Sequence, residues 1–119
     1  MKVSLISVVG IFAVALSSSA YADCAFPKAP DAIPDGKTAS QQEMLDAMAA
    51  FKQYNSDVDA YMTCLDSETE AKIKEAGGAS AIMQLKAMQQ KKRSSANDER
   101  TAKVTSFNEQ VRTFKSRKS

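Results

Sequence analysis

Residues 40–65 read SQQEMLDAMAAFKQYNSDVDAYMTCL, and this stretch decides how the chain folds. Ser40 and Glu43 have the pattern of a capping box, in which each side chain accepts a hydrogen bond from the other residue's backbone amide. We therefore expect a helix to begin at about Gln41. Apolar residues then recur at alternating spacings of four and three, which places them on one face of the helix. The members of this stripe are Met44, Met48, Phe51, Val58, Met62 and Leu65.

Asn55 is the polar member of the same stripe. A buried polar side chain at such a position costs stability but can fix the register between paired helices. The alternative is that the helices diverge there and Asn55 contacts water. Tyr54 and Tyr61 lie one heptad apart beside the stripe, where each ring can be buried while its hydroxyl stays near water.

The first 22 residues have the pattern of a secretory signal peptide. Lys2 provides the charged start, residues 3–16 are apolar, and Ala20-Tyr21-Ala22 matches an Ala-x-Ala cleavage site. The apolar run is short for a membrane span. We expect cleavage after Ala22 and a periplasmic mature chain with no transmembrane segment.

Two cysteines follow the predicted cleavage site, Cys24 and Cys64, and an even number in a small exported chain predicts a disulfide. A lipid anchor on Cys24 is the alternative, because bacterial lipoproteins are modified at a cysteine beside the cleavage site. Lipoprotein processing uses a small residue ahead of that cysteine, whereas Asp23 stands there, so the disulfide is favoured. Closing a loop of about 40 residues stabilises a fold by about 4 kcal/mol on the chain-entropy model.

Residues 23–39 contain three prolines, which exclude a helix and favour an extended arm similar to polyproline. Such an arm can reach back along the helix, because it extends about 3.1 Å per residue while a helix rises about 1.5 Å per residue. Phe26 and Ile33 would then cover part of the helix. Recognition of this stiff segment by an aromatic groove of another protein is an alternative role.

The second half of the chain predicts a helix that pairs with the first. Gly77-Gly78 ends the first helix, because glycine tolerates the backbone conformation that a helix C-terminus needs. Apolar residues at helical spacing follow in 79–88 and 104–114, with a polar stretch between them. We predict an all-α fold in which residues 40–119 form an antiparallel hairpin of two long helices. A break near Ser95, which would give a third helix, is the alternative.

A hairpin that turns at Gly77-Gly78 brings together residues whose numbers sum to about 155. The facing pairs predicted in this way are Met44 with Val111, Met48 with Phe107, Phe51 with Val104, Asn55 with Arg100, and Ile73 with Ile82.

The two halves of the mature chain carry opposite charge. Residues 23–78 hold 11 acidic and 5 basic residues, whereas residues 79–119 hold 3 acidic and 10 basic residues. The helices are therefore electrostatic complements, which favours antiparallel pairing. Each exposed ion pair contributes only about 0 to 1 kcal/mol.

No catalytic or metal-binding pattern is recognisable in the sequence. The chain has no histidine, which is the usual general base and the commonest metal ligand. Cysteines that form a disulfide cannot act as nucleophiles. Met44 and Met48 share a helix face and could bind Cu(I) through sulfur, but methionines at this spacing are also ordinary core residues. We expect a non-enzymatic protein without a cofactor or metal.

Basic residues concentrate in two places, and they are candidate contacts for an anionic surface such as lipopolysaccharide or phospholipid. The alternative is a solvated face that the acidic helix neutralises. Nucleic acid is not expected as a partner, because no aromatic residues that could stack on bases lie among these charges. The candidate residues are Lys91, Lys92, Arg93, Arg112, Lys115, Arg117 and Lys118.

Several motifs together resemble a group of small exported helical proteins of proteobacteria. They are Cys24 before a Pro-rich arm, IPDGKTA at 33–39, YMTCL at 61–65 and FNEQVR at 107–112. The resemblance implies a bacterial periplasmic location and no particular activity. Periplasmic chaperones of the Spy type have a similar size and helicity, but their Leu-Thr-x-x-Gln repeats do not occur in this sequence.

The sequence therefore predicts a periplasmic protein-interaction module whose partner is another envelope protein or the protein itself. Binding to an anionic envelope surface through the basic second helix and tail is the alternative function.

Overall fold

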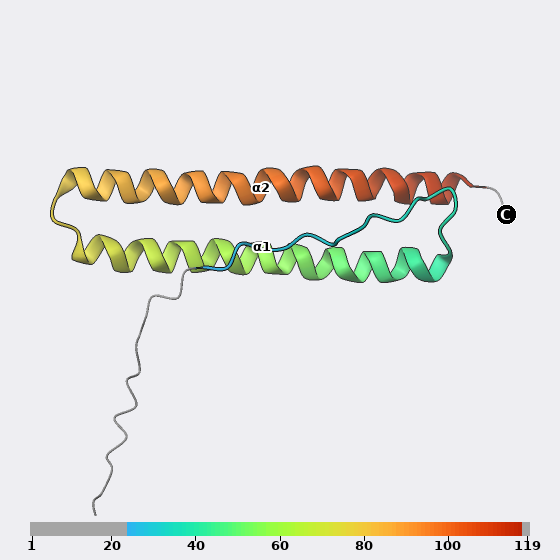
Figure 1. Cartoon of the computed structure of the whole chain (residues 1–119), viewed down its shortest axis with the longest axis horizontal. Coiled ribbons are helices and arrows are strands. Elements are labelled where there is room, and N and C mark those ends of the chain that lie inside the picture. Colours follow the sequence, from blue (N-terminus) through green and yellow to red (C-terminus); the bar gives the residue numbers. More distant parts are fainter. Residues whose placement is uncertain (1–23, 118–119) are drawn as a thin grey trace, which may run out of the picture.

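The computed structural model describes residues 24–117, which form a hairpin of two long helices. Helix α1 spans Gln41–Glu75 and helix α2 spans Ala79–Ser116. The helices lie side by side and antiparallel, joined by a short turn (Figure 1). The predicted all-α hairpin is confirmed. The predicted signal peptide, residues 1–22, lies outside the described residues, as does Lys118.

Both ends of α1 follow from local chemistry. The Ser40 amide donates to the Glu43 carboxylate at 2.9 Å, and the Glu43 amide donates to the Ser40 hydroxyl at 3.1 Å, so the predicted capping box is present. Ala76 ends the helix in an extended conformation. Gly78 then has a φ of +148°, a conformation almost restricted to glycine. This glycine therefore allows the chain to reverse direction.

Helix α2 continues through the polar stretch at 94–97, so the alternative of a break near Ser95 is wrong. Ser94 and Ser95 face solvent, whereas Ala96 is only 1% exposed and packs in a cluster with Tyr61 and Leu65. Most helical stability in proteins comes from tertiary packing of this kind. The contact of Ala96 with α1 thus outweighs the weak helix propensity of its neighbours.

The larger core cluster lies nearer the open end of the hairpin. Phe51 stacks on Phe107 with ring centroids 4.6 Å apart, and Val58 is completely buried. Met44 is buried in the same cluster, so it serves as an ordinary core residue. Its thioether is not exposed to bind copper together with Met48.

The register between the helices differs from the predicted one by three or four residues in the core. Phe107 stacks on Phe51 instead of Met48, and Arg100 pairs with Asp59 instead of facing Asn55. The residue numbers of these pairs sum to 158 and 159 instead of 155. Side chains of a helix lean toward its own N-terminus. In an antiparallel pair, the side chains of α1 therefore lean away from the turn and those of α2 lean toward it. Each α1 side chain then contacts an α2 residue that lies farther from the turn than the residue directly opposite its own backbone.

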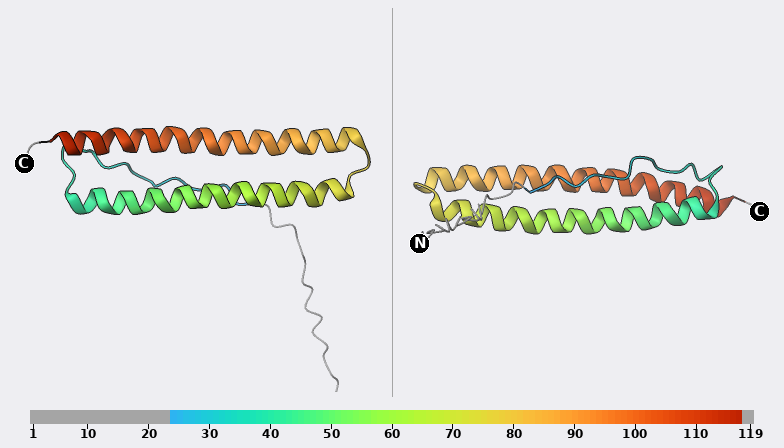
Figure 2. Two further views of the ribbon diagram at one scale, coloured as in Figure 1. Left: turned by 180° about the vertical axis from the view of Figure 1, so that it is seen from behind. Right: turned by 60° about the horizontal axis from the view of Figure 1, so that its bottom comes forward.

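The N-terminal arm, residues 24–39, runs along the seam between the two helices from the middle of the hairpin to its open end (Figures 1 and 2). A disulfide joins Cys24 to Cys64 with the Cα atoms 5.8 Å apart, as predicted. Phe26 meets Tyr61 edge to face at 5.4 Å, and Ile33 packs against the larger core cluster. The arm therefore completes the core on one face of the hairpin.

Candidate interaction surfaces

The disulfide end of the arm is fixed by an acidic side chain of α1. Glu68 accepts a hydrogen bond from the Cys24 backbone and another from Lys72 at 2.5 Å. The hydrogen bond from Lys72 holds the pKa of the Glu68 carboxyl below its usual range. Burial of the carboxyl raises the pKa and so opposes this shift. The positive charges of Lys72 and Lys92 and the hydrogen bond from the Cys24 backbone lower the pKa further. Glu68 is therefore a structural anion, ionised where the arm begins.

The other end of the arm is clamped to the C-terminus of α2. The Gly36 amide donates to the Gln110 side-chain oxygen at 2.9 Å. Arg117 stacks on Phe114 and donates to the carbonyl oxygens of Lys37 and Ala39, each at 3.0 Å. These contacts close the open end of the hairpin. Sequence reasoning missed the hydrogen bonds, because they join residues more than 70 positions apart.

The arm itself is not free to act as a peptide ligand. Pro27 and Pro30 have the Pro-x-x-Pro spacing that such ligands use. However, Pro27 is buried and Pro30 is half-buried along the seam. The residues that an aromatic groove would bind are thus already occupied within the chain.

The opposite face of the hairpin carries a polar groove of about 540 Å³. Asp66 and Cys64 are two residues apart and so point about 160° away from each other around α1, which places this groove on the face without the arm. Arg93 pairs with Asp66 at 2.7 Å and Arg100 pairs with Asp59 at 2.8 Å across it. These ion pairs link α1 to α2. Because each arginine of the groove already has a carboxylate partner, little net charge is left to bind a ligand.

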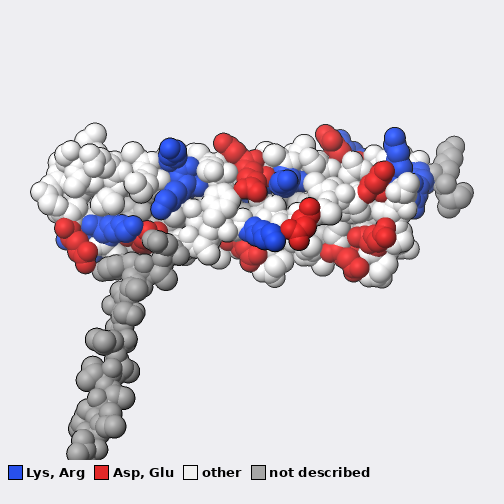
Figure 3. Space-filling model, in the orientation of Figure 1, with Lys and Arg blue, Asp and Glu red and all other residues white. Residues whose placement is uncertain are grey.

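The predicted anionic-surface contacts do not form one patch. Lys91 and Lys92 lie about 20 residues from Arg112 and Lys115, which corresponds to about 30 Å along a helix. Arg93 and Arg117 donate to acceptors within the chain. Figure 3 shows positive and negative side chains interspersed on the face in view.

The turn end of the hairpin lacks a core. Among the described residues, no apolar side chain between Leu65 and Ala96 is buried. Ile73, Ile82 and Leu85 are only half-buried, although Ile73 and Ile82 were predicted to face each other. The sequence already indicates that this end lacks a core, because residues 66–76 contain a single large apolar residue.

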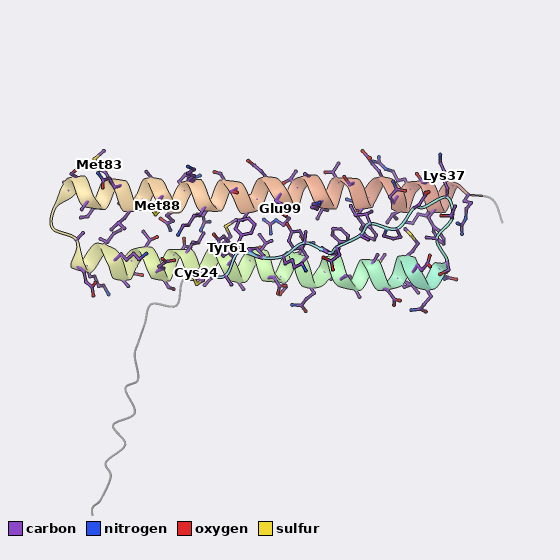
Figure 4. All side chains as sticks on the ribbon, viewed as in Figure 1. Cys24, Lys37, Tyr61, Met83, Met88 and Glu99 are labelled. Carbon is purple, nitrogen blue, oxygen red and sulfur yellow. A yellow bond between two sulfur atoms is a disulfide. The ribbon has the colours of Figure 1, made fainter. Side chains whose placement is uncertain are left out.

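One apolar surface at the turn end, the tip patch, consists of Ala81, Leu85 and Met88 of α2. Together with Lys72 and Glu75 of α1, Ala76 just after it and Gln84 of α2, these residues line a groove of about 300 Å³. Figure 3 shows an uncharged surface over the turn and the first turns of α2. Met88 is 55% exposed and points toward the gap between the helices, nearer the turn than Cys24 (Figure 4). Met83 is 71% exposed and points away from α1 (Figure 4).

Tyr54 presents a buried polar atom that has no hydrogen-bond partner among the described residues. Burial raises the pKa of its hydroxyl and so does the nearby charge of Glu99, while Arg100 lowers it. The phenol therefore stays protonated at neutral pH, and its position inside the core keeps it away from substrates.

The described residues hold no group of three or more acidic, histidine or cysteine side chains arranged to bind a metal ion. Neither described helix has an apolar stretch of the length that a membrane span requires.

No protein-family model matches the chain, and neither a curated protein nor a solved structure matches it significantly.

Proposed function

We propose that this protein is a non-enzymatic interaction module of the periplasm and that it binds its partner through the turn end of the hairpin. The partner is another envelope protein or a second copy of the chain. The observation that carries the proposal is the missing core at this end, where the apolar side chains between Leu65 and Ala96 remain exposed or half-buried.

A two-helix hairpin covers only one side of each helix, and the remaining apolar surface needs another layer. The described part of the arm, residues 24–39, provides that layer from Cys24 to the open end of the hairpin. Residues 79–95 of α2 extend about 25 Å beyond this cover at 1.5 Å per residue. Exposed apolar surfaces of soluble proteins commonly mark interaction sites. The tip patch is the corresponding surface here.

The rest of the molecule is tied together away from the turn. The disulfide fixes one end of the arm and Arg117 fixes the other. A structural disulfide also suits an exported protein, because such bonds persist in oxidising compartments.

The test is cross-linking in living cells with a C-terminally tagged chain, because α2 ends opposite the turn (Figure 1). We expect the wild type to capture a discrete protein that withstands high salt. Met88→Glu should lose that protein, because it places a charge on the tip patch. Met83→Glu is the matched control, since this more exposed methionine points away from α1.

Two results would contradict the proposal. Equal capture by both variants would remove the tip patch from the interaction. Recovery of lipid or lipopolysaccharide alone, lost at high salt, would instead support the anionic-surface function through residues such as Lys91 and Lys115, because exposed charges are screened over about 8 to 10 Å.

A further inference from the structure

We propose that the occupant of the tip patch is a second copy of this chain, which packs about a two-fold axis parallel to the long axis of the hairpin. This inference rests on the proposed function and names its partner. It combines three features: the position of the exposed apolar side chains, the charge of each helix on that face, and the part of the seam that residues 24–39 cover.

The position of the apolar side chains shows which face the copies would share. The groove beside Met88 is lined by Glu68, Leu65 and Lys92 as well. Glu68 is also the residue that accepts the backbone hydrogen bond from Cys24. The groove at the turn end is therefore the continuation of the track that the arm fills. A second hairpin laid on this face extends an existing packing surface.

The charges of the turn end decide which helices meet. On the face that carries the groove, α1 contributes Glu68, Lys72 and Glu75, whereas α2 contributes Lys92 and no acidic residue. A dimer that placed α2 against the partner's α2 would bring like charges together. Placing α1 against the partner's α2 brings opposite charges together in both halves of the interface. Complementarity of this kind selects the orientation of a complex more than its affinity.

The pairing of α1 with the partner's α2 fixes the symmetry. When two hairpins stack face to face, this pairing requires a two-fold axis along the hairpin, with both turns at the same end. Each helix is then antiparallel to both of its neighbours, as in an up-down four-helix bundle. A two-fold interface is self-complementary, so the same residues serve both copies.

The arm limits the contact to the turn end. It lies on the shared face from Cys24 onward and so keeps the open ends of the two hairpins apart (Figures 1 and 2). Leu85 and Met88 then lie close to the axis, where each meets its counterpart. Methionine is well suited to such a position, because its unbranched side chain adapts to irregular gaps.

The experiment is sedimentation equilibrium of the purified, oxidised protein over a range of concentrations. We expect a monomer–dimer equilibrium for the wild type. Met88→Glu and Leu85→Glu should weaken the dimer by about tenfold or more, because each places two negative charges near the axis. Met83→Glu should leave the equilibrium unchanged, since residues 83 and 88 point about 140° apart around the helix. Circular dichroism of each variant checks that the hairpin is still folded.

Cross-linking through an introduced cysteine tests the symmetry separately. Met88→Cys should form a covalent dimer under mild oxidation, and Met83→Cys should not. Equal cross-linking of both positions would overturn the proposed axis.

The failure of this inference is distinguishable from failure of the proposed function. A wild-type protein that stays monomeric at all concentrations overturns self-association. If Met88→Glu nevertheless abolishes capture of a different protein in cells, the tip patch remains an interaction surface with another partner. If a monomeric protein also shows no effect of Met88→Glu on capture, both proposals are wrong.

Discussion

Gly36→Ala should destabilise the protein strongly, although this glycine has an ordinary negative φ. A Cβ atom at this position would lie 2.2 Å from the Gln110 carbonyl oxygen and 2.9 Å from the Phe114 amide nitrogen. Both atoms belong to the backbone of α2 and cannot move aside. Because ordinary contacts begin at 3.4 Å, the arm must withdraw by more than about 1 Å.

The cost of that withdrawal follows from the bonds that it breaks. The Gly36 amide loses its bond to Gln110, and the Arg117 guanidinium loses its carbonyl acceptors. A neutral hydrogen bond contributes about 0.5 to 1.5 kcal/mol and one to a charged group about 1.5 to 3 kcal/mol. We therefore expect the free energy of unfolding to fall by about 2 to 4 kcal/mol, and the melting temperature to fall by at least about 8 °C.

Urea denaturation followed by circular dichroism measures this difference, with Gly77→Ala as the matched control. No atom lies within 4 Å of the position of a Cβ at residue 77. The control should be stabilised by about 0.4 to 1 kcal/mol, because alanine restricts the unfolded chain. The reasoning is refuted if Gly36→Ala unfolds within about 1 kcal/mol of the wild type, since the arm would then not be packed on α2.

Three further predictions concern the arm and the seam. Cys64→Ser should lower the free energy of unfolding by about 4 kcal/mol through loss of the 40-residue loop; an unchanged melting curve would show that the disulfide does not restrain the arm. Ala96→Leu should cost about 1 to 3 kcal/mol in the same assay, because the site is fully buried and would be overpacked; no loss would mean that the helices do not approach closely there. The pKa of Glu68 is lower in the folded protein than in the unfolded chain. Its ionised carboxylate therefore stabilises the fold at a pH above the pKa of the unfolded chain, and this stabilisation is lost as the pH falls through the pKa of the folded protein. Glu68→Gln should therefore flatten the decline of the melting temperature below about pH 4.5, and a parallel decline in both proteins would contradict this assignment.

Much of the fold was predictable because its signals are local. The capping box at Ser40 and the glycine turn at residues 77–78 depend on backbone groups a few residues apart. The apolar stripe reports helical periodicity in the same way. The disulfide followed from the number of cysteines and from the reach of an extended arm. Local hydrogen bonding and chain geometry therefore determined the helices, their antiparallel order and the tied arm.

Other features depend on distances across the helix pair, which no short pattern records. The lean of side chains along each helix moved Phe107 from Met48 to Phe51. Arg117 was a candidate surface cation in the sequence, yet three-dimensional proximity gives it the carbonyl oxygens of the arm as acceptors. The continuity of α2 at Ala96 required knowledge of its contact with α1.

The candidate interaction surface also depends partly on local sequence and partly on tertiary contacts. The sequence by itself determined that the turn end is poor in apolar residues on α1 and basic on α2. Only the tertiary structure decided that the described arm, residues 24–39, leaves Met88 exposed and Leu85 half-buried. The physical reason is that burial depends on which surfaces meet, and the apolar stripe of α2 is the same in sequence whether or not the arm covers it.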